Sequence, residues 1–180
     1  GAKLTADERI RAVSFTGGLG GGRAVAVACA QQMKAAQLEL GGNNPLVILH
    51  DADVEQAADG VVMALTRLNG QWCRALGRLL VHRSLEAAVL DAVAARLSSL
   101  KLGHSLDKNS EMGPLIHRGH LDDVLGRIHG LSLRGGTVQQ WTPVPEGRGV
   151  FCPAALVTGC SPDATTEEIF GPVAAMHTFD

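Results

Sequence analysis

The stretch Asn69-Gly70-Gln71-Trp72-Cys73-Arg74-Ala75-Leu76-Gly77-Arg78 separates a helical pattern from the apolar run Leu79-Leu80-Val81. Its small, polar and glycine-containing composition predicts a loop. A thiol on such a loop can reach a substrate, whereas a lone cysteine is more often a small residue of the core. Cys73 is therefore a candidate nucleophile.

A second unusual stretch, Leu38-Glu39-Leu40-Gly41-Gly42-Asn43-Asn44-Pro45, precedes the first along the chain. A carboxylate beside two glycines is a candidate general base, and it is also a common solvated turn residue. One candidate base and one candidate nucleophile, each near glycine, are more than composition alone would supply. The pair predicts a nucleophile and a base in one chain.

The N-terminal part predicts half of a nucleotide-binding unit. Residues 12–15 are typical of a short strand, residues 17–22 of a glycine turn, and the alanine-rich residues 24–36 of a helix. The N–H groups and dipole at a helix N-terminus favour a pyrophosphate. Arg23 stands where G-x-G-x-x-G needs its third glycine and where a P-loop needs its lysine, which disfavours phosphoryl transfer. A flexible turn without a ligand is the alternative.

The rest of the chain alternates between strand and helix patterns. Strands are predicted over residues 45–49, 79–82, 131–138, 154–157 and 173–179. Helices are predicted from Asp53, from Ser84 to about Leu100, and over residues 117–131. This order predicts an α/β fold with a largely parallel sheet flanked by helices.

Composition excludes several classes of function. The 180 residues carry a net charge of −2 without a basic block, which argues against nucleic acid as a partner. No apolar run is long enough to span a bilayer, and no signal peptide is evident. The four cysteines show no C-x-x-C spacing, which favours the cytoplasm. His117 and His120 have no third partner in the pattern, so we expect no metal site.

The chain resembles the aldehyde dehydrogenase superfamily at five places that occur in the same order along the chain. The resemblance implies the fold of that superfamily. Two of the five places are the cysteine and glutamate stretches above. The other three are Val13-Ser14-Phe15-Thr16-Gly17-Gly18, Met112-Gly113-Pro114-Leu115-Ile116 and Glu167-Glu168-Ile169-Phe170-Gly171-Pro172-Val173. Because members of that superfamily are more than twice as long, we expect these residues to be an incomplete piece, and the piece alone to be inactive.

The resemblance implies a domain organisation and a role for each candidate residue. Residues 1–37 would be the last strand, turn and helix of the dinucleotide-binding domain, and residues 38–180 the nucleophile-bearing catalytic domain. Cys73 would be the nucleophile and Glu39 the base that activates water. The implied cofactor is NAD or NADP. The implied cofactor-binding residues are Gly17, Gly18, Gly22, Leu40, Glu168 and Phe170.

The implied activity is the oxidation of an aldehyde, a small-molecule substrate, to a carboxylic acid through a cysteine thiohemiacetal and a thioester that water hydrolyses. The full-length protein is expected to form a homo-oligomer, a dimer or a tetramer. Three residues depart from the pattern: Gly18 replaces a serine, Thr66 an aromatic or aliphatic residue, and Arg74 a small or apolar residue. The alternatives are a catalytically silent domain of the same fold with an assembly role, and a plain α/β binding domain whose cysteine is fortuitous.

Overall fold

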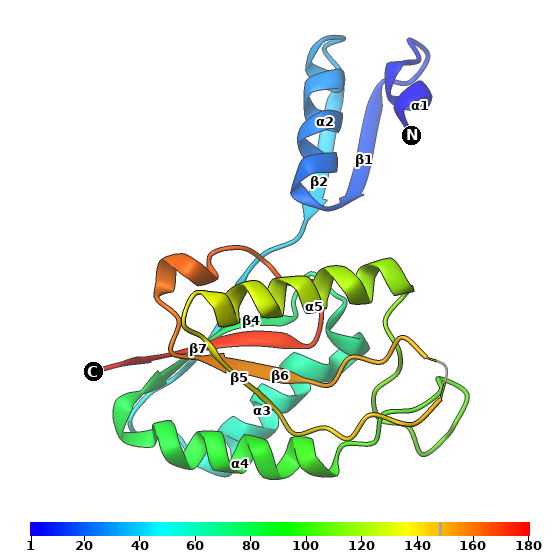
Figure 1. Ribbon diagram of the computed structural model, residues 1–180. Coiled ribbons are helices and arrows are strands. Elements are labelled where there is room, and N and C mark those ends of the chain that lie inside the picture. The colour runs from blue at the N-terminus through cyan, green and yellow to red at the C-terminus, as the bar shows by residue number, and fades with distance from the viewer. Residues whose placement is uncertain (148) are drawn as a thin grey trace. The chain divides into compact units, whose positions relative to one another are not determined.

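The computed structural model describes residues 1–147 and 149–180 and divides the chain into two compact units, Gly1–Gly42 and Asn43–Asp180 (Figure 1). Both units combine helices with a sheet that is parallel or mostly parallel. The predicted α/β class is therefore confirmed.

The first unit contains helix α1 (Ala2–Ala6), strand β1 (Ala12–Gly17), helix α2 (Leu19–Ala30) and strand β2 (Ala35–Leu40). Strands β1 and β2 pair in parallel, with Thr16 opposite Glu39 and Gly17 opposite Leu40. The predicted N-terminal strand and helix are thus present, although their bounds differ, whereas most of the glycine turn predicted over residues 17–22 is helical.

The predicted helix over residues 24–36 is wrong at both ends. Helix α2 begins at Leu19, inside the glycine run, because its glycines allow close packing: a Cβ on Gly22 would overlap the side chain of Leu40, and one on Gly21 the ring of Phe15. The helix ends at Ala30, and Met33 then takes a φ of 53°. Parallel pairing with β1 makes residues 35–40 a strand despite their alanines.

The second unit is built on a five-stranded sheet in the order β3-β4-β7-β6-β5. All neighbouring strands are parallel except the edge pair of β5 and β6. The strands are β3 (Asn44–Ile48), β4 (Leu76–His82), β5 (Thr137–Gln140), β6 (Ala155–Thr158) and β7 (Val173–Phe179).

Helices cover both faces of this sheet (Figure 1). Helices α3 (Val54–Thr66) and α4 (Glu86–Ser99) pack on one face, and α5 (Arg118–Leu133) packs on the other. Three short 3₁₀ turns complete the unit, η1 (Arg67–Gly70), η2 (Arg83–Leu85) and η3 (Pro162–Thr165). Strand β6 is buried on both sides, with Leu156 in the α3–α4 core and Val157 in the α5 core.

Two helix starts follow from local chemistry. The Asp53 carboxylate accepts a hydrogen bond from the Gln56 backbone N–H at 2.9 Å and caps α3, as predicted. His117 caps α5, because its Nδ1 accepts from the His120 backbone N–H at 3.0 Å. This second cap fixes the end of α5 that lies next to the segment of residues 112–116.

Candidate active site

Cys73 lies in the turn between η1 and β4, and its thiol is exposed. Cys29, Cys152 and Cys160 are buried. Burial raises the pKa of the Cys152 thiol to about 11, which keeps it protonated at neutral pH. Among the cysteines, Cys73 is therefore the one whose position suits attack on a substrate.

The chain reaches this turn through three successive residues with positive φ: Leu68 (50°), Asn69 (59°) and Gly70 (70°). Such residues cost free energy unless their surroundings hold them, and they concentrate at functional sites. A Cβ on Gly70 would collide with the backbone of Gly171 and Pro172. The cysteine turn and the final sequence motif are thus in direct backbone contact.

Side chains of the turn also bind the Met112–Ile116 segment. The Asn69 amide donates to the Pro114 carbonyl oxygen at 3.1 Å and accepts from the Gly113 N–H at 2.7 Å. The Gln71 side-chain oxygen accepts from the Ile116 N–H at 3.0 Å. These bonds explain why that segment accompanies the cysteine motif.

Two consecutive asparagines at the start of β3 hold two different loops. The Asn44 amide donates to the carbonyl oxygens of Cys73 and Ala75 at 2.8 and 3.0 Å. The Asn43 amide donates to the Thr165 carbonyl oxygen at 2.7 Å. Asn43 and Asn44 therefore hold the turn that carries Cys73 and the loop that leads to Glu168.

Trp72, next to Cys73, contacts two cationic side chains. The guanidinium carbons of Arg67 and Arg74 each lie 5.8 Å from the centroid of the Trp72 ring. Such contacts contribute about 0.5–1 kcal/mol each at exposed sites. The indole N–H of Trp72 is buried and has no hydrogen-bond partner among the residues that the structure describes.

Phe170 and Glu168 lie on the loop between η3 and β7. Phe170 is 40% exposed, which is high for a large aromatic side chain, so its ring is available to pack against a ligand. Its carbonyl oxygen lies 2.6 Å from His120 Nε2, and the two rings are 6.1 Å apart. Because a carbonyl only accepts, Nε2 carries the proton.

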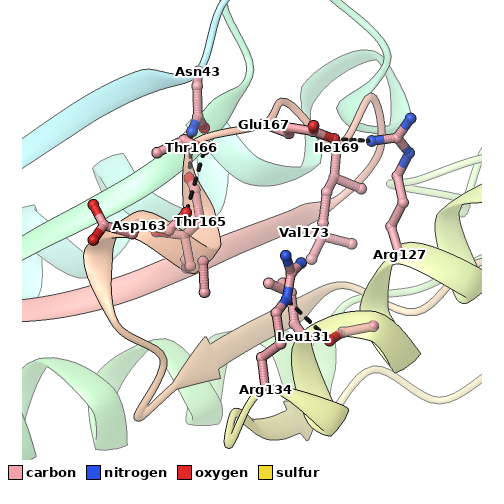
Figure 2. Close-up of a pocket in the computed structure, with 14 residues that line it drawn as sticks. Asn43, Arg127, Leu131, Arg134, Asp163, Thr165, Thr166, Glu167, Ile169 and Val173 are labelled. Atoms are coloured by element: carbon pink, nitrogen blue, oxygen red, sulfur yellow. Dashed lines mark hydrogen bonds and ion pairs between the residues drawn. The ribbon is translucent and has the colours of Figure 1, made fainter.

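A hollow of about 300 Å³ lies behind the same loop (Figure 2). Arg127 reaches Glu167 across it at 3.3 Å, and Asn43 reaches Thr165. Glu167 and Ile169 line the hollow, whereas Glu168 and Phe170 are not among its lining residues. Glu168 and Phe170 are therefore separate from the hollow, although they lie on the same loop.

The remaining candidate residues lie in the first unit. Gly17 ends β1, and Gly18 precedes α2 as its N-cap; among the described residues no side chain caps this helix, and its first turn contains no acidic residue. The N–H groups of that turn remain available to an anion. Gly22 is buried, and a Cβ at this position would overlap the side chain of Leu40. The backbone here therefore has no side chain of its own to cover it. This arrangement fits the diphosphate of a dinucleotide.

Glu39 is exposed on β2. Leu38 and Leu40 are half-buried, so the carboxylate of Glu39 lies on the opposite face of the strand. Within residues 1–147 and 149–180, this carboxylate has no hydrogen-bond or ion-pair partner. A carboxylate in this state can accept a proton from water.

Two further classes of site find no support. Over residues 1–147 and 149–180, no group of three metal-ligating side chains comes together. Within the same ranges no helix has both the length and the apolar character that crossing a bilayer requires.

Comparison with known proteins agrees with the fold and the motifs. The aldehyde dehydrogenase family model matches residues 1–180. A succinate-semialdehyde dehydrogenase [NADP(+)] of Schizosaccharomyces pombe is 36% identical over 100% of this chain and 37% of its own length. A succinate-semialdehyde dehydrogenase [NADP(+)] of Mycolicibacterium paratuberculosis is 32% identical over 97% of this chain and 38% of its own length.

The crystal structure of betaine aldehyde dehydrogenase from Staphylococcus aureus, in complex with NAD+, superimposes with a TM-score of 0.94. It is 30% identical and covers 99% of this chain and 37% of its own. The chain belongs to the aldehyde dehydrogenase family. It spans a little over a third of the length of these relatives, 37% for the first of them.

Proposed function

We propose that the full protein oxidises an aldehyde to a carboxylic acid with NAD(P)+, with Cys73 as nucleophile and Glu39 as general base. The observation that carries the proposal is the exposed thiol of Cys73 on a turn held by Asn44, Asn69 and Gln71. A nucleophile needs both access to the substrate and a fixed position.

The first step is addition of the Cys73 sulfur, as thiolate, to the aldehyde carbon. A carbon–sulfur bond forms, and the carbonyl electron pair moves to the oxygen, which becomes an oxyanion. The backbone N–H of Cys73 makes no hydrogen bond with a described residue, so it can donate to that oxygen.

Bound NAD(P)+ supplies the acceptor for the hydride that leaves the substrate carbon. The residues that would hold this cofactor are Gly17, Gly18, Gly22 and Leu40 in the first unit, and Glu168 and Phe170 in the second. The uncapped start of α2 suits the diphosphate, and the exposed ring of Phe170 suits an aromatic surface.

The last step is hydrolysis of the thioester on Cys73. Glu39 accepts a proton from water, the resulting hydroxide adds to the carbonyl carbon, and the carbon–sulfur bond breaks. The acid leaves, and the Cys73 sulfur is restored. Hydrolysis distinguishes this reaction from transfer of the acyl group to a thiol.

The experiment compares the full protein with its Cys73→Ala and Glu39→Gln variants in the presence of an aldehyde and NAD(P)+, by absorbance of the reduced nicotinamide. We expect no turnover for Cys73→Ala. Glu39→Gln should give one burst of reduced cofactor and then stall, with an acyl group on Cys73 detectable by mass spectrometry. Equal steady-state rates for all three proteins would contradict the mechanism. If none of the three turned over an aldehyde, a catalytically silent domain with an assembly role would be favoured.

Two further proposals concern the setting of the protein, one supported by the family resemblance and the other by the cysteine spacing. We expect a homo-oligomer, a dimer or a tetramer, in the cytoplasm. Light scattering after size-exclusion chromatography measures the former, and cell fractionation the latter.

A further inference from the structure

The nucleophile turn carries a cluster of positive charge that the reaction above does not use. We define the cation cluster as Arg67, Trp72 and Arg74. Trp72 and Arg74 flank Cys73 in sequence, and both guanidinium groups contact the Trp72 ring, at 5.8 Å from its centroid in each case. Both arginines are exposed.

Neither positive charge has a carboxylate partner among the residues that the structure describes. Arg9, Arg83, Arg96 and Arg127 each form an ion pair with at least one carboxylate. Neither Arg67 nor Arg74 forms an ion pair or hydrogen bond with a residue in the described ranges. Two like charges on one aromatic ring repel each other, so an anion nearby would relieve an unfavourable arrangement.

The backbone maintains this arrangement. The left-handed residues Leu68, Asn69 and Gly70 reverse the chain between Arg67 and Trp72, which returns the Arg67 side chain to the nucleophile turn. The same turn is anchored by Asn69 and Gln71 to residues 113–116. The Trp72 indole N–H, buried and unpartnered among the described residues, is a further donor in the cluster that lacks an acceptor.

We propose that the cation cluster makes this site selective for aldehydes that carry a negative charge, such as a carboxylate, over neutral and cationic aldehydes. The inference rests on the proposed function, because it concerns the substrate of the Cys73 thiol. Guanidinium groups suit carboxylates through paired N–H donors, and their field raises the local concentration of anions. A trimethylammonium aldehyde would meet repulsion at the same place.

The first experiment tests the charge without requiring catalysis. Two methanethiosulfonate reagents with the same reactive group, one with a sulfonate and one with a trimethylammonium, are reacted with the protein. Mass spectrometry of the Cys73 peptide gives each rate relative to that of a free cysteine peptide. We expect the sulfonate to react faster, and the preference to fall as salt is raised.

Substitutions assign the preference to the two arginines. Arg67→Gln and Arg74→Gln should each reduce the sulfonate preference roughly two- to fivefold, and the double variant about tenfold. The double variant with lysine at both positions should keep the preference. Arg134→Gln removes the same charge at the C-terminal end of α5, about 24 Å along the helix from its first residue, Arg118, and should change nothing. An equal ratio in the wild type and the double Gln variant, or no effect of salt on the wild type, would overturn the proposal.

The second experiment measures kcat/KM of the full protein for succinate semialdehyde, propionaldehyde and betaine aldehyde. The order should be anionic, neutral, cationic, and the double Gln variant should lose most of the anionic preference with propionaldehyde little changed. A preference for betaine aldehyde would overturn the inference but leave the proposed function intact. No turnover of any aldehyde would overturn the proposed function, and the thiol reagents would then decide the charge selectivity alone.

Discussion

The backbone of Gly70 lies so close to Gly171 that a side chain on Gly70 would overlap the Gly171–Pro172 peptide. Gly70 also has a φ of 70°, which residues with a side chain rarely adopt. We therefore expect Gly70→Ala to lower the free energy of unfolding by about 2–5 kcal/mol, from backbone strain plus overpacking. Urea unfolding followed by circular dichroism measures this change.

A matched control exists on α5. A Cβ on Gly126 would have no atom within 4 Å, and its backbone is helical. Gly126→Ala should therefore raise the free energy of unfolding by about 0.5–1 kcal/mol. If both variants moved the unfolding midpoint equally, the contact between the nucleophile turn and the final motif would not matter for stability.

Alkylation should separate the cysteines by burial. Iodoacetamide at neutral pH should label Cys73 first, because its thiol is exposed, and should leave Cys29, Cys152 and Cys160 unlabelled until the chain unfolds. The pKa of Cys152, raised by burial to about 11, adds a second reason for its inertness. Peptide mass spectrometry with and without urea follows each site. Labelling of Cys152 in the folded protein at the rate of Cys73 would contradict this.

His120 should affect cofactor binding by holding the loop that carries Phe170. His120→Ala removes the donor to the Phe170 carbonyl oxygen and the ring contact, so the Phe170 loop should loosen. In the full protein we expect KM for NAD(P)+ to rise about two- to tenfold, as for loss of one hydrogen bond, with a smaller change in kcat. His120→Gln retains an N–H donor and should recover most of the affinity. Equal KM values for Ala and wild type would show that the loop does not depend on His120.

His177 should make the protein sensitive to acid. Its Nε2 lies 2.9 Å from Thr165 Oγ1; that hydroxyl donates to the Pro162 carbonyl oxygen, so it accepts from His177. Burial lowers the pKa of His177 below its usual 6.5, and the charge of Arg78 lowers it further. The unfolded chain therefore binds this proton more tightly, and the His177 contribution to stability is lost as the pH falls below about 6.5.

His177→Gln provides the comparison, since its amide can still donate to Thr165 but does not titrate. Urea midpoints measured between pH 5 and 8 should rise with pH for the wild type and rise less for the variant. Parallel curves would place the acid sensitivity elsewhere.

Strands β6 and β7 were predictable because they are short apolar runs in the interior of the sheet. The strand predicted over residues 131–138 was wrong, because residues 131–133 end α5 and strand β5 is Thr137–Gln140. Residues 173–179 were predicted as a strand and form β7, and residues 154–157 differ from β6 by one position. Periodicity also indicated α5. In these segments local pattern and tertiary burial agree.

Residues 19–40 show where pattern fails. The glycines were interpreted as a turn, but Gly21 and Gly22 lie in a helix where Phe15 and Leu40 leave no room for a Cβ. Helix propensity cannot reveal such packing, because the partners are other elements of the fold. Strand β2 was missed for a related reason, since only pairing with β1 makes Ala35 and Ala36 extended.

In the candidate site too, some features were predictable from the sequence and others were not. The exposure of Cys73 followed from the polar turn around it. The roles of Asn43, Asn44 and Asn69 did not, because their partners lie between 29 and 122 residues away in sequence. An asparagine before a proline is typical of many turns, and only the tertiary structure shows what it binds.

Asn43 and Asn44 have a consequence for how this molecule tolerates change. Asn43 binds the loop before Glu168 and the next residue, Asn44, binds the turn that carries Cys73, so the alignment of those two loops is set by two adjacent residues. The spacing does not depend on the length of chain that joins them. Insertions in the intervening surface connections, such as residues 103–110, should therefore leave the registration of the two loops unaltered.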